Sequence, residues 1–382
     1  MKIWILSLGL LLYSVAGFSN GIKMTTYNVA LAPGFVPLSE ERVSVVIDLL
    51  QQQESDYFCL AEVWRKKDRK KILKALEEDY PHVHMTDIDQ LRRGPRPTCR
   101  ISDLFGEGKF VSCILDKCKD QDDSDFTQCL TQKCDVPLDG LIGERPYCAQ
   151  SLMAQVGSST TRAIIRVLNP LWRAGIFAYK GSNGLMVLSK KPFAKKGLVD
   201  LTNISTLNRR GALYTKIIDE NKEPHHLYCA HLSANLERTA PYTGNFEGWE
   251  QENMAQVQKL LESADHGPRA TYVMGDMNCS FALPSLGIRP DFEASCELFR
   301  QAGFDNFFLE QNPECTFCEE NTLLKNDLKD GRPNFMLDHI FTKHVPQSKT
   351  SRVFDELVEV EVDGKTILSH PSDHYGVVLE RD

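Results

Sequence analysis

The chain has 382 residues, of which 42% are hydrophobic and 25% charged, so it is long enough to bury a large core. This composition excludes a disordered or a fibrous protein. The 44 Lys and Arg residues against 52 Asp and Glu residues give a net charge of −8, which disfavours a globally basic nucleic-acid-binding protein. A local cationic groove is still compatible with that charge.

The N-terminus has the pattern of a secretory signal peptide. Lys2 precedes an apolar run over residues 3–15, and the small residues Ala16 and Gly17 follow. We predict a signal peptide over residues 1–17 and a secreted, extracellular protein. The apolar run is shorter than the roughly 20 residues that span a bilayer, so we expect no transmembrane helix.

The cysteines concentrate in one segment. Six of the twelve lie between Cys99 and Cys148, among polar residues that cannot form a core alone. We therefore predict a disulfide-rich insertion at about residues 95–150, within a single domain over residues 18–382. The wide spacings in an exported chain favour disulfides over a zinc site. Export also makes Asn203, which lies in an Asn-Ile-Ser sequence, a predicted glycosylation site.

Outside this segment, short apolar strands alternate with amphipathic helices. The mixture of hairpins and strand–helix–strand units predicts an α/β (α+β) fold with two mixed sheets packed together under outer helices. In chain order, we predict a strand at Met24–Val29, a helix capped by Ser39 with Glu40 and Glu41 in its first turn, a strand at Tyr57–Val63, a helix at Lys66–Leu76, strands at Gly184–Ser189, Ala212–Ile218 and His226–Leu232, a helix containing Met254, Val257 and Leu261, and strands at Tyr272–Gly275, Phe335–Thr342 and Tyr375–Glu380.

Polar side chains recur where these strands end. Asn28, Glu62, His231 and Asp276 each follow an apolar run. A carboxylate there is costly to bury unless a metal or a partner neutralises it, so Glu62 is either a metal ligand or the salt-bridge partner of the adjacent Arg65.

Three further polar residues lie near the ends of later strands. Asn278 follows Asp276 by two positions, which suits either a phosphate site or an ordinary Asx turn. Asp338 could accept a hydrogen bond from His374, an arrangement that lets an imidazole act as a base near neutral pH.

Seven short motifs follow one another along the chain: Thr26-Tyr27-Asn28-Val29, Leu60-Ala61-Glu62-Val63-Trp64, Asn183-Gly184-Leu185, Ala230-His231-Leu232, Gly275-Asp276-Met277-Asn278, Leu337-Asp338-His339-Ile340 and Ser372-Asp373-His374. In sequence and in order they resemble the motifs of the metal-dependent endonuclease/exonuclease/phosphatase superfamily. The resemblance covers residues 22–382 and implies a four-layered αββα sandwich of two mixed β-sheets flanked by helices, with a divalent-metal phosphodiesterase site.

Within the superfamily the chain most resembles the neutral sphingomyelinase branch, through segments 27–35, 210–214, 231–234 and 315–322. It departs from that branch at Ala61, at Met277 and in the cysteine-rich insertion. The branch implies a Mg²⁺-dependent phosphodiesterase, in which water attacks in line, that converts sphingomyelin to ceramide and phosphocholine at a membrane surface. The alternatives are a secreted endonuclease resembling deoxyribonuclease I, with nucleic acid as its substrate, and a catalytically inactive binding module of the same fold.

The resemblance also implies roles for single residues. Glu62, Asn28 and Asp373 would bind Mg²⁺, which Mn²⁺ or Co²⁺ could replace. His374, oriented by Asp338, would be the general base, with Asp276 as the rival for that role.

The remaining site residues would handle the substrate. Asn278 would position the phosphate, and His231 would stabilise developing charge or assist the leaving oxygen. Asn183 and Trp172 are candidate substrate-binding residues. For contact with lipid we consider segment 168–179 and the loop at 33–36, although aromatic clusters more often pack in a core.

Overall fold

The computed structural model describes residues 21–86, 97–118, 133–155, 160–171, 174–237, 242–324 and 334–381. The predicted signal peptide and Trp172 lie outside these ranges. Within them, no helix combines the length and the apolar character needed to cross a membrane.

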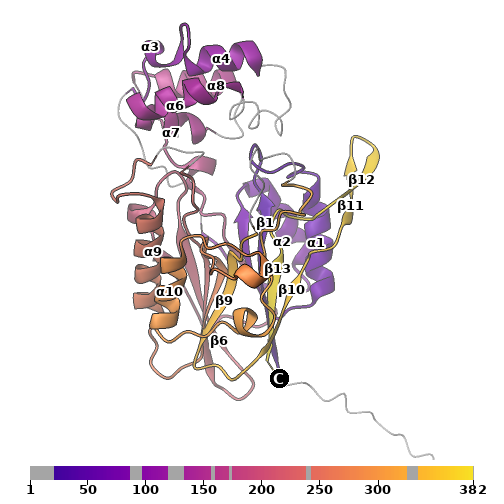
Figure 1. The fold of residues 1–382 in the computed structure, drawn as a ribbon. Helices are drawn as coiled ribbons and strands as arrows, with labels where there is room; N and C mark the ends of the chain where they lie inside the picture. The colour runs from indigo at the N-terminus through magenta and orange to yellow at the C-terminus, as the bar shows by residue number, and fades with distance from the viewer. Residues whose placement is uncertain are drawn as a thin grey trace, which may run out of the picture.

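Two mixed β-sheets form the centre of the fold (Figure 1). Within the described ranges, the first sheet has six strands in the order β10-β13-β1-β2-β4-β3, and the second has five in the order β5-β6-β7-β8-β9. The strands of the first sheet are β1 (Ile22–Leu31), β2 (Tyr57–Val63), β3 (His82–His84), β4 (Met186–Ser189), β10 (Lys349–Val353) and β13 (Gly376–Arg381); those of the second are β5 (Lys195–Asp200), β6 (Gly211–Ile218), β7 (Pro224–His231), β8 (Thr271–Asp276) and β9 (Asp338–Lys343).

Helices cover the outer face of each sheet, which confirms the predicted four-layered α/β sandwich (Figure 1). Apolar side chains of α1 (Arg42–Gln53) and α2 (Lys66–Leu76) pack on β1 and β2 of the six-stranded sheet. On the other side lie α9 (Trp249–Ala264) and α10 (Glu293–Gln301). Their buried apolar side chains belong to the same core cluster as side chains from strands of both sheets. The short helix α11 (Phe307–Gln311) lies against β10 and β9.

The predicted helix start at Ser39 is wrong. The helix begins at Arg42, and Glu40 and Glu41 precede it in a turn in which Leu38 has a positive φ of 57°. The physical reason is the side chain of Arg42, which is fully buried and donates hydrogen bonds to three backbone carbonyls of other segments. These distant contacts, and not a local cap, set the first turn.

The cysteine-rich segment forms a helical group at one end of the molecule (Figure 1). The disulfides Cys99–Cys148 and Cys113–Cys134 tie it together, and its apolar side chains form a cluster of their own. Its helices are α3 (Ile101–Leu104), α4 (Phe110–Lys117), α6 (Asp135–Glu144), α7 (Pro146–Met153) and α8 (Thr160–Leu168). The last helix ends beyond the predicted boundary near residue 150.

Further disulfides lie in the body of the fold. Cys59 of β2 and Cys229 of β7 join the two sheets, Cys279 pairs with Cys296, and Cys315 pairs with Cys318. A separate two-stranded sheet, β11 (Val358–Val362) and β12 (Lys365–Ser369), projects from the body as a hairpin (Figure 1).

Candidate active site

Strands of both sheets bring the predicted site residues to one place. In the five-stranded sheet, His231 ends β7, Asp276 ends β8 and Asp338 begins β9. The register pairs Asp276 with both of the other two residues, so the three side chains start from adjacent backbone positions. Asn28 and Glu62 come from β1 and β2 of the other sheet.

A glycine allows the close approach of β7 and β8 beside this site. Gly275 has a φ of +144°, and a Cβ atom there would lie 1.8 Å from the carbonyl oxygen of Ala230. Any other residue would push β8 away from β7. The Gly-Asp sequence therefore places Asp276 against the neighbouring strand.

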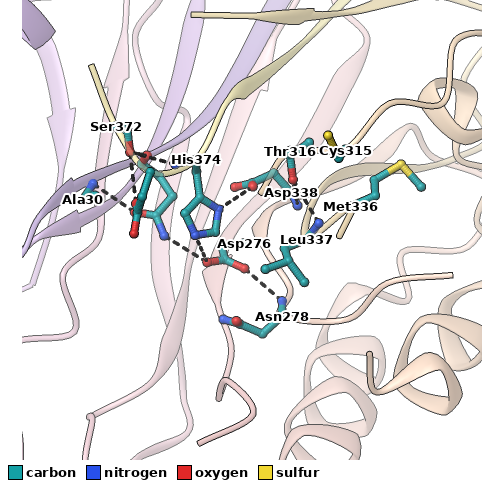
Figure 2. A network of polar contacts seen from close by, with 12 residues as sticks. Ala30, Asp276, Asn278, Cys315, Thr316, Met336, Leu337, Asp338, Ser372 and His374 are labelled. Carbon is teal, nitrogen blue, oxygen red and sulfur yellow. Dashed lines mark hydrogen bonds and ion pairs between the residues drawn. The ribbon is translucent and has the colours of Figure 1, made fainter. Parts of the chain in front are cut away.

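Asp276 is the centre of a polar network that joins the two sheets (Figure 2). Asn28 Nδ2 donates to Asp276 Oδ2 over 2.9 Å, and the backbone N–H of Asn278 donates to Asp276 Oδ1 over 2.9 Å. The Nε2 atoms of His231 and His374 lie 3.4 Å and 3.8 Å from Asp276 Oδ2. One carboxylate thus faces an amide and two imidazoles.

His374 also pairs with Asp338, as the sequence predicts. The distance from His374 Nδ1 to Asp338 Oδ2 is 2.7 Å, and both residues are buried. Asp338 Oδ1 has no hydrogen-bond partner among the described residues. The Phe317 ring lies edge-on to the imidazole at 5.0 Å between centroids. Asp338 therefore fixes the orientation of the ring, which leaves Nε2 directed toward Asp276 (Figure 2).

Glu62 occupies a strained backbone position at an irregularity of the β1–β2 ladder. Its φ is +62°, and the register shifts between Asn28 and Leu31 on the partner strand. Left-handed conformations cost a non-glycine residue roughly 1 kcal/mol and cluster at functional sites. The bulge turns the side chain toward His231, whose Nε2 lies 4.0 Å from Glu62 Oε1.

Charge and burial shift the pKa values of the site. Burial, reinforced by the charge of Asp373, raises the pKa of Glu62, and burial raises the pKa of Asp276 to about 7. Burial lowers the pKa of His231, and Arg210 adds to that effect. Burial also disfavours the charged form of His374, but the carboxylates of Asp338 and Asp276 outweigh it and raise the pKa of this imidazole.

Two buried arginines belong to the site, although the sequence analysis assigned them no role. Arg42 donates to the carbonyls of Val29, Ala30 and Pro371, and so holds the backbone beside Asn28 and Asp373. Arg210 is 3% exposed, and its Nε and Nη1 atoms have no hydrogen-bond partner within the described part of the chain. Its charge acts on both Glu62 and Asp276. The signal in the sequence was an arginine pair directly before an apolar strand.

The other predicted residues lie at varied distances from this centre. Asp373 accepts a long hydrogen bond of 3.4 Å from Ser372, whose hydroxyl also donates to the Asn28 carbonyl. Asn183 is buried, its Oδ1 accepts from the Leu185 N–H, and its Nδ2 has no hydrogen-bond partner among the residues that the structure describes. Asn203 is exposed, as a glycosylation acceptor must be.

The lipid-contact candidates divide into buried and exposed parts. Ile176 and Phe177 are packed in the interior, so they cannot touch a membrane. Tyr179 stacks on Trp64 at 4.8 Å. Leu171 and Phe35 are exposed by 71% and 40%.

The donor set fits a hard divalent cation. Glu62 and Asp373 are carboxylates whose charges interact, and Asn28, paired with Ala61 next to Glu62, offers an amide oxygen, Oδ1, that accepts from the Ala30 N–H. These two negative charges oppose each other, because Asp373 disfavours the ionised form of Glu62. Oxygen ligands around excess negative charge are what Mg²⁺ requires.

Comparisons with known proteins agree with this geometry. Residues 25–374 match the sequence model of the Endonuclease/Exonuclease/phosphatase family. Among solved structures, SmcL is 15% identical with a TM-score of 0.57 (95% of this chain and 99% of that chain covered), and sphingomyelinase C from Streptomyces griseocarneus is 14% identical with a TM-score of 0.56 (95% and 99%). Beta toxin from Staphylococcus aureus, with bound magnesium ions, is 13% identical with a TM-score of 0.54 (94% and 99%). A search of curated proteins finds no match. The family match spans nearly the whole chain, and the protein therefore belongs to the Endonuclease/Exonuclease/phosphatase family.

Proposed function

We propose that the protein is a secreted, Mg²⁺-dependent phosphodiesterase that hydrolyses sphingomyelin to ceramide and phosphocholine. The observation that carries this proposal is the hydrogen bond between Asn28 and Asp276, which brings strands of two different sheets together at one acidic site. The oriented pair of His374 and Asp338 lies in the same network. A binding module would have no use for this combination of acidic residues and a paired histidine.

Glu62, Asn28 and Asp373 would hold the cation. When bound, Mg²⁺ supplies Lewis-acid polarisation of the phosphoryl oxygens and neutralises charge. The Glu62 side chain is 20% exposed, and the nearby charge of Asp373 disfavours its ionised form, which favours such a ligand over a surface salt bridge. The alternative partner, Arg65, is instead paired with Asp68 and Glu40.

Proton transfer would fall to His374 and Asp276. Their facing atoms lie 3.8 Å apart, and burial raises the pKa of Asp276 to about 7. The carboxylates of Asp338 and Asp276 raise the pKa of His374, so the imidazole must release its proton, with Asp276 as the nearby acceptor, before it can accept one from water. His374 is our first choice for the base that deprotonates the attacking water, because Asp338 holds its ring in place.

Three polar groups would face the phosphate and the leaving oxygen. The unpaired guanidinium atoms of Arg210 suit a phosphate oxygen, and the Asn278 amide, which donates to the Leu232 carbonyl, is held at the same edge. His231, kept neutral by burial, would stabilise the charge that develops on the leaving oxygen.

A lipid substrate is favoured by exposed apolar groups on the β11–β12 hairpin. Leu357, Ile367 and Leu368 are exposed by 49%, 39% and 64%, and the hairpin ends four residues before Asp373. Apolar side chains beside a site let an enzyme reach a substrate embedded in a bilayer.

The test offers purified protein with Mg²⁺ two substrates side by side, sphingomyelin vesicles and duplex DNA. We expect release of phosphocholine, no cleavage of DNA, and loss of activity with a chelator. Cleavage of DNA alone, weakening steeply as salt rises, would favour the nuclease alternative. His374→Ala should lower turnover by about 10²- to 10⁴-fold; a loss of about tenfold or less would transfer the role of base to Asp276.

A further inference from the structure

A small disulfide loop lies directly behind the pair of His374 and Asp338. Cys315 and Cys318 are bonded across only two intervening residues, Thr316 and Phe317. Figure 2 shows Cys315 and Thr316 on the far side of Asp338 from Asp276. The proposed reaction does not use these side chains directly.

The loop touches both members of the pair. Thr316 Oγ1 accepts hydrogen bonds from the backbone N–H groups of Leu337 and Asp338 over 2.9 Å and 3.0 Å. The carbonyl of Thr316 accepts from the N–H of Tyr375, next to His374, over 2.7 Å. The Phe317 ring contacts the imidazole of His374 edge-on. The turn over residues 315–318 therefore fixes both the backbone position of Asp338 and the orientation of the His374 ring.

The same disulfide lies where a reductant can reach it. Cys315 is partly exposed, whereas both cysteines of Cys59–Cys229 and of Cys279–Cys296 are fully buried. The guanidinium of Arg352 lies 3.8 Å and 3.7 Å from the two sulfur atoms and donates to the Cys315 carbonyl. A neighbouring cation stabilises a thiolate, which favours opening of the bond.

We propose that the Cys315–Cys318 disulfide is a positioning element for the pair of Asp338 and His374, and that its reduction by a dithiol slows the enzyme. This inference rests on the proposed function. In the reaction, one thiolate of the dithiol attacks a protein sulfur and forms a mixed disulfide. The second thiol of the reductant then attacks this mixed disulfide and forms the reductant's own internal disulfide, so that two electrons and two protons pass to Cys315 and Cys318.

The expected consequence is a loss in kcat with little change in KM. The loop holds proton-transfer groups and not the substrate, and a shift of 1 Å in such groups can cost about 10²-fold in rate. Because the disulfide closes a very short loop, its removal should change the free energy of unfolding far less than it changes turnover.

The experiment compares the full-length wild type with C315S/C318S and with C113S/C134S, a control that removes one disulfide from the remote insertion. Turnover is measured on sphingomyelin micelles and on bis(p-nitrophenyl) phosphate, before and during titration with dithiothreitol, while alkylation maps the opened cysteines. We expect C315S/C318S to lose about 10- to 100-fold in kcat, with KM within about twofold. Before dithiothreitol is added, the C113S/C134S control should have the same kcat as the wild type. During the titration, both proteins should lose activity as the Cys315 and Cys318 thiols appear. C315S/C318S should show no further loss.

A second pair of variants tests the same loop without breaking the disulfide. Thr316→Val removes the acceptor of the Asp338 N–H and should lower kcat, whereas Thr316→Ser keeps the hydroxyl and should restore it. Histidine-ring NMR of the substrate-free protein should show a shifted His374 signal in C315S/C318S alone. Full kcat with an open Cys315–Cys318 bond, or a C113S/C134S variant that loses as much kcat as C315S/C318S before any dithiothreitol is added, would overturn the inference. If the wild type hydrolyses neither substrate, the proposed function fails, and the His374 signal still decides the positioning role.

Discussion

The contribution of the disulfide between the two sheets to the free energy of unfolding can be worked out from the length of chain that it closes. Cys59 and Cys229 are 170 residues apart in sequence, so their bond closes a very long loop in the unfolded protein. The chain-entropy relation for such a loop gives about 5 kcal/mol of stabilisation. The nested Cys99–Cys148 bond shortens the effective loop, but the logarithmic dependence changes this value by only about 0.3 kcal/mol.

We therefore expect C59A/C229A to lose about 5 kcal/mol in the free energy of unfolding, a large share of the total for a domain. Equilibrium urea unfolding, followed by fluorescence and circular dichroism under non-reducing conditions, measures this change. Turnover per folded molecule should stay close to wild type, because packing and the hydrogen bond between Tyr57 and Thr215 also hold the sheets together.

The matched control is C113S/C134S, which opens a loop of 21 residues and should lose about 3 kcal/mol. A loss below about 1 kcal/mol in C59A/C229A would refute the reasoning. It would mean that the unfolded chain keeps β2 and β7 close without the bond.

Three further outcomes can be checked. Glu62→Gln should lower Mg²⁺-dependent turnover by about 10³-fold or more without lowering the unfolding midpoint, since it removes a charge that Asp373 repels; full activity at saturating Mg²⁺ would exclude Glu62 from the site. Arg210→Met keeps the side-chain volume but removes the guanidinium, so kcat/KM should fall by about 10²- to 10³-fold; unchanged kinetics would show that Arg210 does not face the phosphate. Burial and the stacked His266 lower the pKa of His226 to about 4, so the folded state resists a proton that the unfolded state accepts below about pH 6.5. Stability should therefore fall by on the order of 1 to 2 kcal/mol between pH 6.5 and 4, allowing for partial solvation, and His226→Gln should remove this part of the slope seen in urea unfolding.

Local pattern was enough to predict the buried central elements. The predicted strand at Tyr57–Val63 and helix at Lys66–Leu76 coincide with β2 and α2, because each buries one continuous apolar face. The exposed strands were not predicted. β5, with the sequence Lys-Lys-Gly-Leu-Val-Asp, lies at a sheet edge and shows no strict alternation.

Some site residues could likewise be predicted from local sequence, whereas others depend on contacts with distant parts of the chain. Asp276 and His374 stand out in sequence because a carboxylate and an imidazole adjoin apolar strands. The roles of Arg42 and Thr316 depend on contacts with residues far away in the chain, such as Pro371 and Asp338. A short window around Arg42 carries no such signal, and the segment around Thr316 resembles a family motif without revealing its contacts. Only the folded arrangement therefore shows what these two residues hold in place.

The backbone at Glu62 has a consequence for how the protein can evolve. Its left-handed conformation suits glycine better, and the nearby charge of Asp373 disfavours its ionised carboxylate. Glycine at this position would relieve both costs at once, at the expense of the proposed cation ligand. Under selection for heat resistance alone, Glu62→Gly should therefore be favoured, so thermal stability and the proposed activity place opposite demands on this one residue.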